Sequence, residues 1–261
     1  MKKIDEMITK TQIINDLKKI GIKKGMTIIV HTSLSSIGWI VGGPITVIQA
    51  IQEVVTDEGT LVMPAHSAEI SDPKNWSNPP VNKKLWKELK AEMPAFDARL
   101  SPTYQIGIVA EIFRTFPEVL RSNHPVYSFC AWGKYSSYII ENQSLDNGLG
   151  ELSPLAKIYE LDGSVLLLGT NYDSNTSMHL SEHRVGVFPD IKQSSPVLIN
   201  NLKVWKEFTE IEYDEASFNK IGKKFEERHS LNLGLIGNAP SKLIRQRDIV
   251  DFTTENILRY Q

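Results

Sequence analysis

The chain has 261 residues, 41% of them hydrophobic and 8% aromatic, which is enough to bury the core of one large α/β domain. Its 29 basic and 31 acidic residues leave a formal net charge of -2, which argues against nucleic acid as a partner. The single cysteine, Cys130, excludes an internal disulfide framework and a multi-cysteine metal site, and its apolar neighbours favour a core position.

The N-terminal stretch MKKIDEMITK lacks the apolar core of a secretory signal, and no apolar run is long enough to span a bilayer. We therefore expect a cytoplasmic protein without a membrane partner. Residues 6–20 carry apolar side chains at the spacing of an amphipathic helix, with Thr9 or Thr11 as its cap.

Residues 26–63 are expected to form a β-α-β unit. A short β-branched run at 26–30 is typical of a buried strand. After a serine- and glycine-rich loop, Pro44 is well placed as the first residue of a helix that runs through Val55. Another strand at 60–63 completes the unit, so the two strands should be parallel and joined by a right-handed crossover.

The stretch 66–100 is irregular and rich in proline, tryptophan and lysine. Such a long insertion in a compact domain is usually functional, so we expect a lid or a substrate-binding loop. Ser101 and Pro102 should then open a helix, and one face of that helix should carry Val109, Ile112, Phe113 and Phe116.

Towards the C-terminus, a strand at 165–169 should lead through a polar loop into a helix that begins near Ser177. Residues 197–205 are typical of a hairpin that turns at Asn200 and Asn201. Two further helices are expected at 214–229 and 241–259, capped by Asp214 and Ser241.

This order of elements predicts an α/β fold of three layers. A central mixed, partly parallel sheet should be flanked by helices and joined by a smaller C-terminal α+β portion. We expect a single domain over residues 1–261, with 66–100 as an insertion on the substrate side and 190–261 as a C-terminal subregion.

The strand at 165–169 is followed by the most informative residues, His179, Glu182 and His183. On a helix they fall at i, i+3 and i+4, on one face. A carboxylate there can hold one imidazole nitrogen protonated and leave the other as a base, which acyl transfer to an amine requires. Spacing alone leaves open an ordinary amphipathic helix with two half-exposed histidines.

The same letters, His-x-x-Glu-His, match the signature of inverted zinc metalloproteases. In such a site His179 and His183 would bind zinc and Glu182 would act as the base. A further protein ligand is needed, and none is evident from spacing. A zinc hydrolase is the competing enzyme hypothesis.

The loop at 31–38 could bind a phosphate or pyrophosphate, because it is rich in serine and precedes a helix N-terminus. Hydroxyls of Ser33, Ser35 and Ser36 would add hydrogen-bond donors. The pattern is neither a P-loop nor GxGxxG, so an ordinary strand-to-helix connection also remains open.

Together, these segments resemble the aminoglycoside 3-N-acetyltransferase family, also called antibiotic N-acetyltransferases. The matches run in chain order over about residues 28–184: HTSLSSIG at 31–38, GG at 42–43, GTLVMP at 59–64, FD at 96–97, GIVAEIFR at 107–114, RSNHP at 121–125, SFCAWG at 128–133, SP at 153–154, LLG at 167–169 and NTSMHLSE at 175–182. Their joint order is far more specific than any one block.

The resemblance implies a single antibiotic N-acetyltransferase-like domain without a metal ion. It would move the acetyl group of acetyl-CoA directly to an amine, the 3-amino group of an aminoglycoside, and so confer antibiotic resistance. In that mechanism His179 is the base, Glu182 orients it and His183 assists. The CoA contacts implied by the resemblance are His31, Ser33, Leu34, Ser35, Ser36, Ser101 and Thr103.

A polycationic acceptor should meet carboxylates, and Asp72 and Asp97 of the insertion are the substrate-binding candidates. Five lysines crowd the same region, so a different amine is also considered. A third hypothesis is a CoA-binding homologue that has lost catalysis. The sequence does not indicate an oligomeric state. His124, which precedes a proline, has either a structural or a catalytic role.

Overall fold

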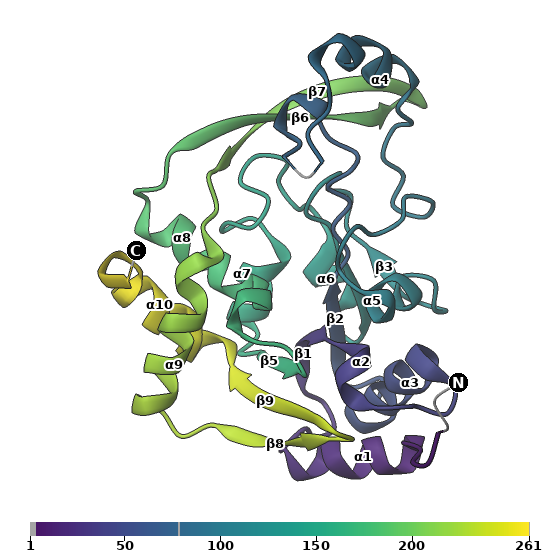
Figure 1. Ribbon diagram of the computed structural model, residues 1–261, viewed down its shortest axis with the longest axis vertical. Coiled ribbons are helices and arrows are strands. Elements are labelled where there is room, and N and C mark those ends of the chain that lie inside the picture. Colours follow the sequence, from purple (N-terminus) through teal and green to yellow (C-terminus); the bar gives the residue numbers. More distant parts are fainter. Residues whose placement is uncertain (1–3, 78, 261) are drawn as a thin grey trace.

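The computed structural model describes residues 4–77 and 79–260. Its centre is a seven-stranded sheet with the order β3-β4-β2-β1-β5-β9-β8 (Figure 1). The central strand β1 (Thr27–Thr32) pairs in parallel with β2 (Thr60–Pro64) and β5 (Ser164–Leu168). The other pairings are antiparallel and involve β3 (Leu120–Arg121), β4 (Phe129–Gly133), β8 (Asn232–Ile236) and β9 (Ala239–Arg245). The predicted mixed sheet and the parallel β1–β2 pair are confirmed.

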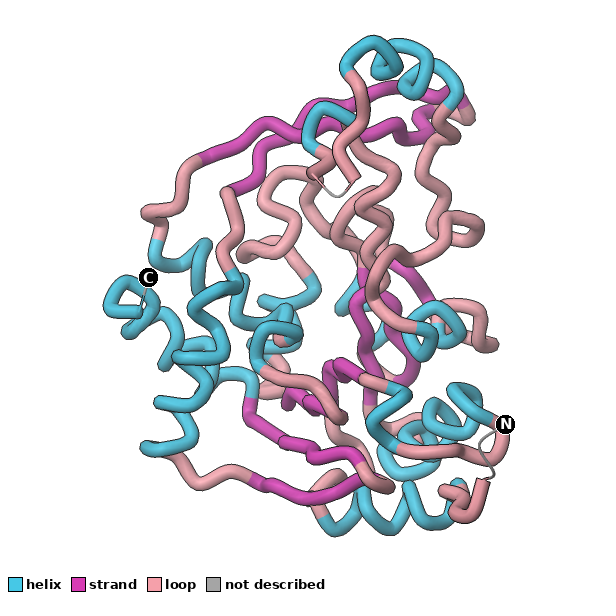
Figure 2. Tube along the Cα trace, viewed as in Figure 1, coloured by secondary structure: helices cyan, strands magenta, loops and turns pink. Residues whose placement is uncertain are grey.

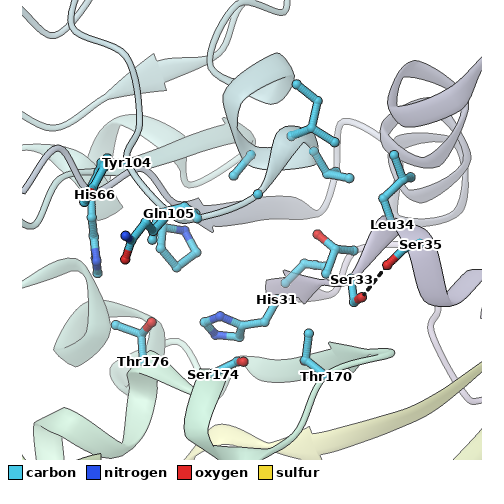
Figure 3. A pocket seen from close by; sticks show the side chains of 18 of the residues that line it. His31, Ser33, Leu34, Ser35, His66, Tyr104, Gln105, Thr170, Ser174 and Thr176 are labelled. Atoms are coloured by element: carbon cyan, nitrogen blue, oxygen red, sulfur yellow. Dashed lines mark hydrogen bonds between the residues drawn. The ribbon is translucent and has the colours of Figure 1, made fainter. Parts of the chain in front are cut away.

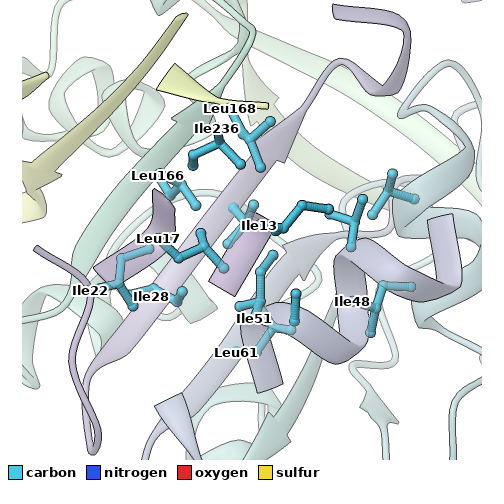
Figure 4. Close-up of a cluster of buried hydrophobic side chains, with 14 of the residues drawn as sticks. Ile13, Leu17, Ile22, Ile28, Ile48, Ile51, Leu61, Leu166, Leu168 and Ile236 are labelled. Atoms are coloured by element: carbon cyan, nitrogen blue, oxygen red, sulfur yellow. The ribbon is translucent and has the colours of Figure 1, made fainter. Parts of the chain in front are cut away.

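Helices cover both faces of the sheet, because successive side chains of a strand point to opposite faces and those of the central strands are buried on both. One face carries α1 (Lys10–Lys19), α3 (Gly43–Val55) and α5 (Ile108–Phe113), whose apolar side chains meet those of the strands in one cluster (Figure 4). The other face carries α6 (Ser136–Ile140), α7 (Pro154–Glu160), α8 (His179–Val185), α9 (Phe218–Arg228) and α10 (Gln246–Tyr260).

Local signals set several element boundaries as expected. Thr9 caps α1, since its hydroxyl accepts a hydrogen bond from the Gln12 backbone N–H at 3.2 Å. Pro44 lies in the first turn of α3, one residue after the helix begins at Gly43. Helix α9 follows a 3-10 turn (Glu215–Ser217) that Asp214 caps.

Two expected helix starts are wrong. Ser101 and Pro102 do not open a helix, and α5 begins only at Ile108. The intervening segment is held in a non-helical path because Glu111 accepts hydrogen bonds from the backbone N–H and the hydroxyl of Thr103. Ser241 does not cap a helix either, since it lies in β9 opposite Leu168 of β5. Pairing with the two neighbouring strands, β5 and β8, outweighs its capping tendency.

The insertion is less irregular than expected and packs on a long hairpin. Residues 66–100 contain α4 (Trp86–Glu92), which lies beside β6 (Asp190–Ile199) and β7 (Leu202–Ile211) above the sheet (Figure 1). Trp205 of β7 donates its indole N–H to the Lys90 carbonyl at 3.1 Å. The hairpin turns at Asn200 and Asn201, both with positive φ, so the predicted turn is confirmed within a longer hairpin.

The C-terminal region is divided between two structures. The hairpin β6–β7 forms a separate two-stranded sheet, whereas β8 and β9 extend the central one. Loops make up most of the chain between the hairpin and the central sheet (Figure 2). Over residues 4–77 and 79–260, no helix is both long and apolar enough to cross a bilayer.

Candidate active site

A cavity of about 1140 Å³ opens at the carboxyl ends of β1 and β5 (Figure 3). Ligands of open α/β sheets gather at this edge, where polar residues follow adjacent parallel strands. Its walls come from the loop after β1, the start of the insertion, residues 104–110 and the segment that leads into α8. Three histidines lie in these walls: His31, His66 and His179.

His179 and Glu182 form a dyad at the start of α8. The His179 Nδ1 lies 2.5 Å from the Glu182 Oε2, and the other carboxylate oxygen accepts from the Asp214 backbone N–H at 2.8 Å. Glu182 is fully buried, whereas the His179 side chain is 14% exposed. The rings of Tyr213 and Phe218 pack against the imidazole with centroids 4.7 and 5.1 Å away.

The hydrogen bond to Glu182 determines which imidazole nitrogen of His179 can act as a base. An ionised carboxylate only accepts hydrogen bonds, so Nδ1 must carry the proton that it donates to Glu182. The Nε2 lone pair is then available on the cavity side as a base. The geometry of a buried carboxylate, an oriented imidazole and a cavity suits proton abstraction from a nucleophile.

His183 does not line the cavity. Its Nε2 lies 2.8 Å from the hydroxyl of Tyr213, which donates to the buried carboxylate of Glu210. Glu210 also accepts from the Gly148 backbone N–H. Burial lowers the pKa of His183 to about 4 and raises the pKa of Glu210 to about 7.

No sequence motif points to Glu210 or Tyr213. The one available signal was the alternation in β7, where Phe208 and Glu210 both point inward. A glutamate at an inward strand position usually has a specific partner.

Two further histidines of the cavity are neutral. Burial and, to a smaller extent, the proximity of a second ionisable ring, His179, lower the pKa of His31 and of His66 to about 3. The Nε2 atom of each ring is buried and has no hydrogen-bond partner in the described part of the chain. Such atoms cost free energy unless a ligand satisfies them.

The structure brings four of the seven candidate CoA contacts to the cavity, namely His31, Ser33, Leu34 and Ser35. Leu34 and Ser35 belong to the short helix α2 (Leu34–Ile37). Ser36 instead donates its hydroxyl hydrogen to Ser33 Oγ at 2.8 Å, behind the cavity wall.

The two later candidates for CoA binding lie elsewhere. Ser101 is buried, and its hydroxyl accepts from the backbone N–H of Asp97 at 3.0 Å. Its carbonyl accepts from Arg121 at 2.5 Å. Thr103 is held by Glu111, so neither residue lines the cavity.

The structure also places the two acceptor-binding candidates away from the cavity. Asp72 is buried between the insertion and the hairpin, where it pairs with Lys90 and accepts from the Ser194 hydroxyl at 3.0 Å. Asp97 accepts from the backbone N–H groups of Arg99 and Leu100 at 2.7 and 3.1 Å. Both carboxylates therefore stabilise the loops in which they lie.

Two acidic side chains that the sequence did not suggest line the cavity. They are Asp173 and Glu215, both exposed and both on 3-10 turns that flank the dyad. Within the chain as described, no lysine or arginine lines the cavity. The lysines of the insertion therefore do not oppose a cationic ligand there.

His124 and Cys130 have structural surroundings. The Nδ1 atom of His124 accepts from the backbone N–H groups of Val126 and Tyr127 at 3.1 and 2.9 Å, which fixes the turn before β4. Cys130 is fully buried in β4, and burial raises its pKa to about 12. A thiol of this kind is a poor nucleophile.

The zinc hypothesis is not favoured by this geometry. His179 and His183 are directed to different partners, Glu182 and Tyr213, and Glu182 is too buried to activate a water molecule in the cavity. Across residues 4–77 and 79–260, no group of three or more His, Cys, Asp or Glu side chains is arranged to hold a metal ion.

The fold is α/β, and a His–Glu dyad lies beside the cavity at the carboxyl edge of its mixed sheet. A model of the aminoglycoside 3-N-acetyltransferase family matches residues 29–257, so the chain belongs to this family and is an acyltransferase. The resemblance inferred from the sequence motifs is thereby confirmed.

Several relatives are similar over nearly their whole length. The SPbeta prophage-derived aminoglycoside N(3')-acetyltransferase-like protein YokD of Bacillus subtilis is 47% identical over 257 residues, which cover 97% of this chain and 94% of YokD. The crystal structure of YokD superposes with a TM-score of 0.95, at 45% identity and with coverage of 97% and 94%. Aminoglycoside N(3)-acetyltransferase VII of Streptomyces paromomycinus is 31% identical over 97% of this chain and 92% of its own. The structure of AAC-IIIb in a binary complex with CoASH has a TM-score of 0.87, at 29% identity and with 97% of each chain covered.

Proposed function

We propose that this protein transfers the acetyl group of acetyl-CoA directly to the 3-amino group of an aminoglycoside, in the cytoplasm, and thereby confers antibiotic resistance. The single observation that carries the proposal is the His179–Glu182 dyad, buried on its carboxylate side and open to a cavity on its imidazole side. Family membership and the CoA complex of a relative support the choice of donor and acceptor.

In the proposed reaction the Nε2 of His179 removes a proton from the attacking amine. The amine nitrogen forms a bond to the acetyl carbon, the carbon–sulfur bond breaks, and CoA leaves as the thiol once it has received a proton. Glu182 keeps the imidazole in the required tautomer and stabilises its charged form. His183, through Tyr213, supports this arrangement without contacting the acceptor.

The donor would bind along the loop after β1. His31, Ser33, Leu34 and Ser35 offer backbone and hydroxyl groups along one side of the cavity. The cavity exceeds the roughly 300–1,000 Å³ of a typical single-ligand site, which suits two substrates bound together. Residues 66–100 would form the wall on the acceptor side, since His66 and Ala68 line the cavity.

The acceptor is inferred from charge. Asp173 and Glu215 would attract a polycation, which is consistent with an aminoglycoside.

The decisive test measures thiol release from acetyl-CoA against a panel of aminoglycosides and simple polyamines. A blank without acceptor measures any background transfer to the protein itself. We expect release that depends on an aminoglycoside, and His179→Ala should lower kcat by about 100- to 10,000-fold while CoA still binds by calorimetry.

Other outcomes separate the alternatives. Full activity of His179→Ala would remove this residue from the mechanism. Release with a simple polyamine alone would retain the reaction and change the acceptor. Saturable CoA binding without turnover on any amine would support the non-catalytic homologue.

A further inference from the structure

We propose that His66 recognises the acceptor: its imidazole accepts a hydrogen bond from an amino or hydroxyl group of the bound aminoglycoside. This inference rests on the function proposed above and adds a specificity residue to it. His66 follows β2 by two residues and lies in the wall of the same cavity as His179.

The His66 ring is held in place before any ligand binds. It packs edge-on against Tyr127 and Phe129, with centroids 5.5 Å away in both cases and interplanar angles of 86° and 84°. The His66 carbonyl accepts from the Tyr104 backbone N–H at 2.8 Å, which fixes the backbone beneath the ring. A side chain fixed in this way loses little conformational entropy when it binds a ligand.

The ring is nevertheless unsatisfied. Its Nε2 is buried without a hydrogen-bond partner among residues 4–77 and 79–260, and burial keeps the pKa at about 3. A neutral imidazole offers one nitrogen lone pair as a hydrogen-bond acceptor. Burial of the Nε2 atom without a hydrogen bond costs free energy, and a ligand that supplies this hydrogen bond would remove the cost.

The position of His66 indicates that it lies at the end of the cavity where the acceptor would bind. In Figure 3, His66 and Tyr104 lie at the opposite end from Leu34 and Ser35 of α2. A row of ring contacts connects His66 to Tyr127 and Tyr127 to Tyr213, with centroids 5.5 and 5.6 Å apart. Tyr213 in turn packs against the proposed base, His179.

Charge at this end decides the chemistry of the partner. Glu215 is close enough to Tyr127 to raise the pKa of its hydroxyl, after the larger effect of burial and that of Glu210. Glu215 favours a cationic ligand, and the ammonium and hydroxyl groups of an amino sugar are hydrogen-bond donors. The complementary group on the protein is an acceptor, which the neutral His66 supplies.

The test compares His66→Phe, which keeps the aromatic packing, with His66→Gln, which restores an accepting oxygen. With the aminoglycoside that the wild type acetylates, His66→Phe should raise the KM for the acceptor about 10-fold and leave kcat within about threefold. The KM for acetyl-CoA should not change. His66→Gln should recover most of the acceptor affinity.

His229→Gln is the matched control, since its ring stacks on Phe225 away from the cavity. CoA affinity, measured by calorimetry, reports that each variant is folded. If His66→Phe does not fold, His66→Leu takes its place in the same comparison.

Two results would overturn the role of His66 while leaving the proposed function intact. One is an unchanged acceptor KM in the variant without the imidazole. The other is a rise in the KM for acetyl-CoA instead. Calorimetric titration of the aminoglycoside into protein with CoA adds a measure that does not need turnover. If the wild type neither binds nor acetylates any aminoglycoside, both proposals are wrong.

Discussion

Replacing Glu182 with glutamine should abolish most of the activity without loosening the fold or the cofactor site. The carboxylate accepts two hydrogen bonds, from His179 Nδ1 at 2.5 Å and from the Asp214 backbone N–H at 2.8 Å. In the variant, the amide oxygen must remain with the Asp214 N–H, because that group can only donate. The amide NH₂ then faces Nδ1.

The consequence is a change of tautomer. Nδ1 becomes a hydrogen-bond acceptor, the ring proton moves to Nε2, and the nitrogen that faces the cavity loses its lone pair. The imidazolium formed in the transition state also loses its counter-charge. General-base catalysis is typically worth about 100- to 10,000-fold, so we expect kcat to fall by that factor. CoA affinity should be unchanged, since Glu182 does not line the cavity.

The assay is acceptor-dependent thiol release at saturating acetyl-CoA, with CoA binding measured by calorimetry. Glu227→Gln is the matched control, because this glutamate lies on the surface and pairs with Lys224 of the same helix. A kcat of Glu182→Gln clearly above about 1% of the wild-type value would refute the role of Glu182 in fixing the tautomer, since that role requires a loss of at least ~100-fold. A loss of CoA affinity would also refute it.

Two predictions concern stability. Burial raises the pKa of Glu210 to about 7, so its favourable contribution is complete at low pH and is lost as the pH rises through this value. Glutamine does not titrate, so the unfolding free energy of the wild type should fall relative to that of Glu210→Gln by about 2–3 kcal/mol as the pH rises from about 5 to 9. Urea melts of both proteins across this pH range measure the difference. Curves of unfolding free energy against pH that run parallel for the two proteins would contradict the prediction. In Gly222→Ala, the new Cβ would lie 2.1 Å from the buried ring of Tyr172, so the variant should lose about 3 kcal/mol in the same assay. Gly234→Ala is its control, because a Cβ at that position would lie no closer than 3.7 Å to its nearest neighbour, Ile20. An equal loss of unfolding free energy in the two variants would show that the structure relieves the clash at Gly222.

The elements that the sequence predicts correctly depend on local chemistry. The β-branched run of β1 and the proline in the first turn of α3 determine a β-α-β unit wherever it is placed. Asn200 and Asn201 tolerate positive φ and therefore specify the hairpin turn. The His179–Glu182 contact follows from i, i+3 spacing on one helix, which no tertiary partner has to supply.

Errors arise where a local preference competes with a distant partner. Ser241 is a good capping residue, but it pairs with Leu168 across the sheet. Asp72 has the chemistry of a substrate contact, but Lys90 and Ser194 engage it from two other segments. Burial would raise the pKa of Asp72, and these hydrogen bonds outweigh that effect and leave it lowered.

The amino-acid sequence by itself therefore determined the family, the order of the elements and the His179–Glu182 contact, because these depend on neighbours within a few positions. Only the tertiary structure decided the walls of the cavity. His66 and Glu215 lie far from His179 along the chain, and they line the same cavity only because the insertion and the segment after the hairpin pack over the same edge of the sheet. Packing between distant segments depends on the whole set of buried surfaces, which local periodicity does not encode.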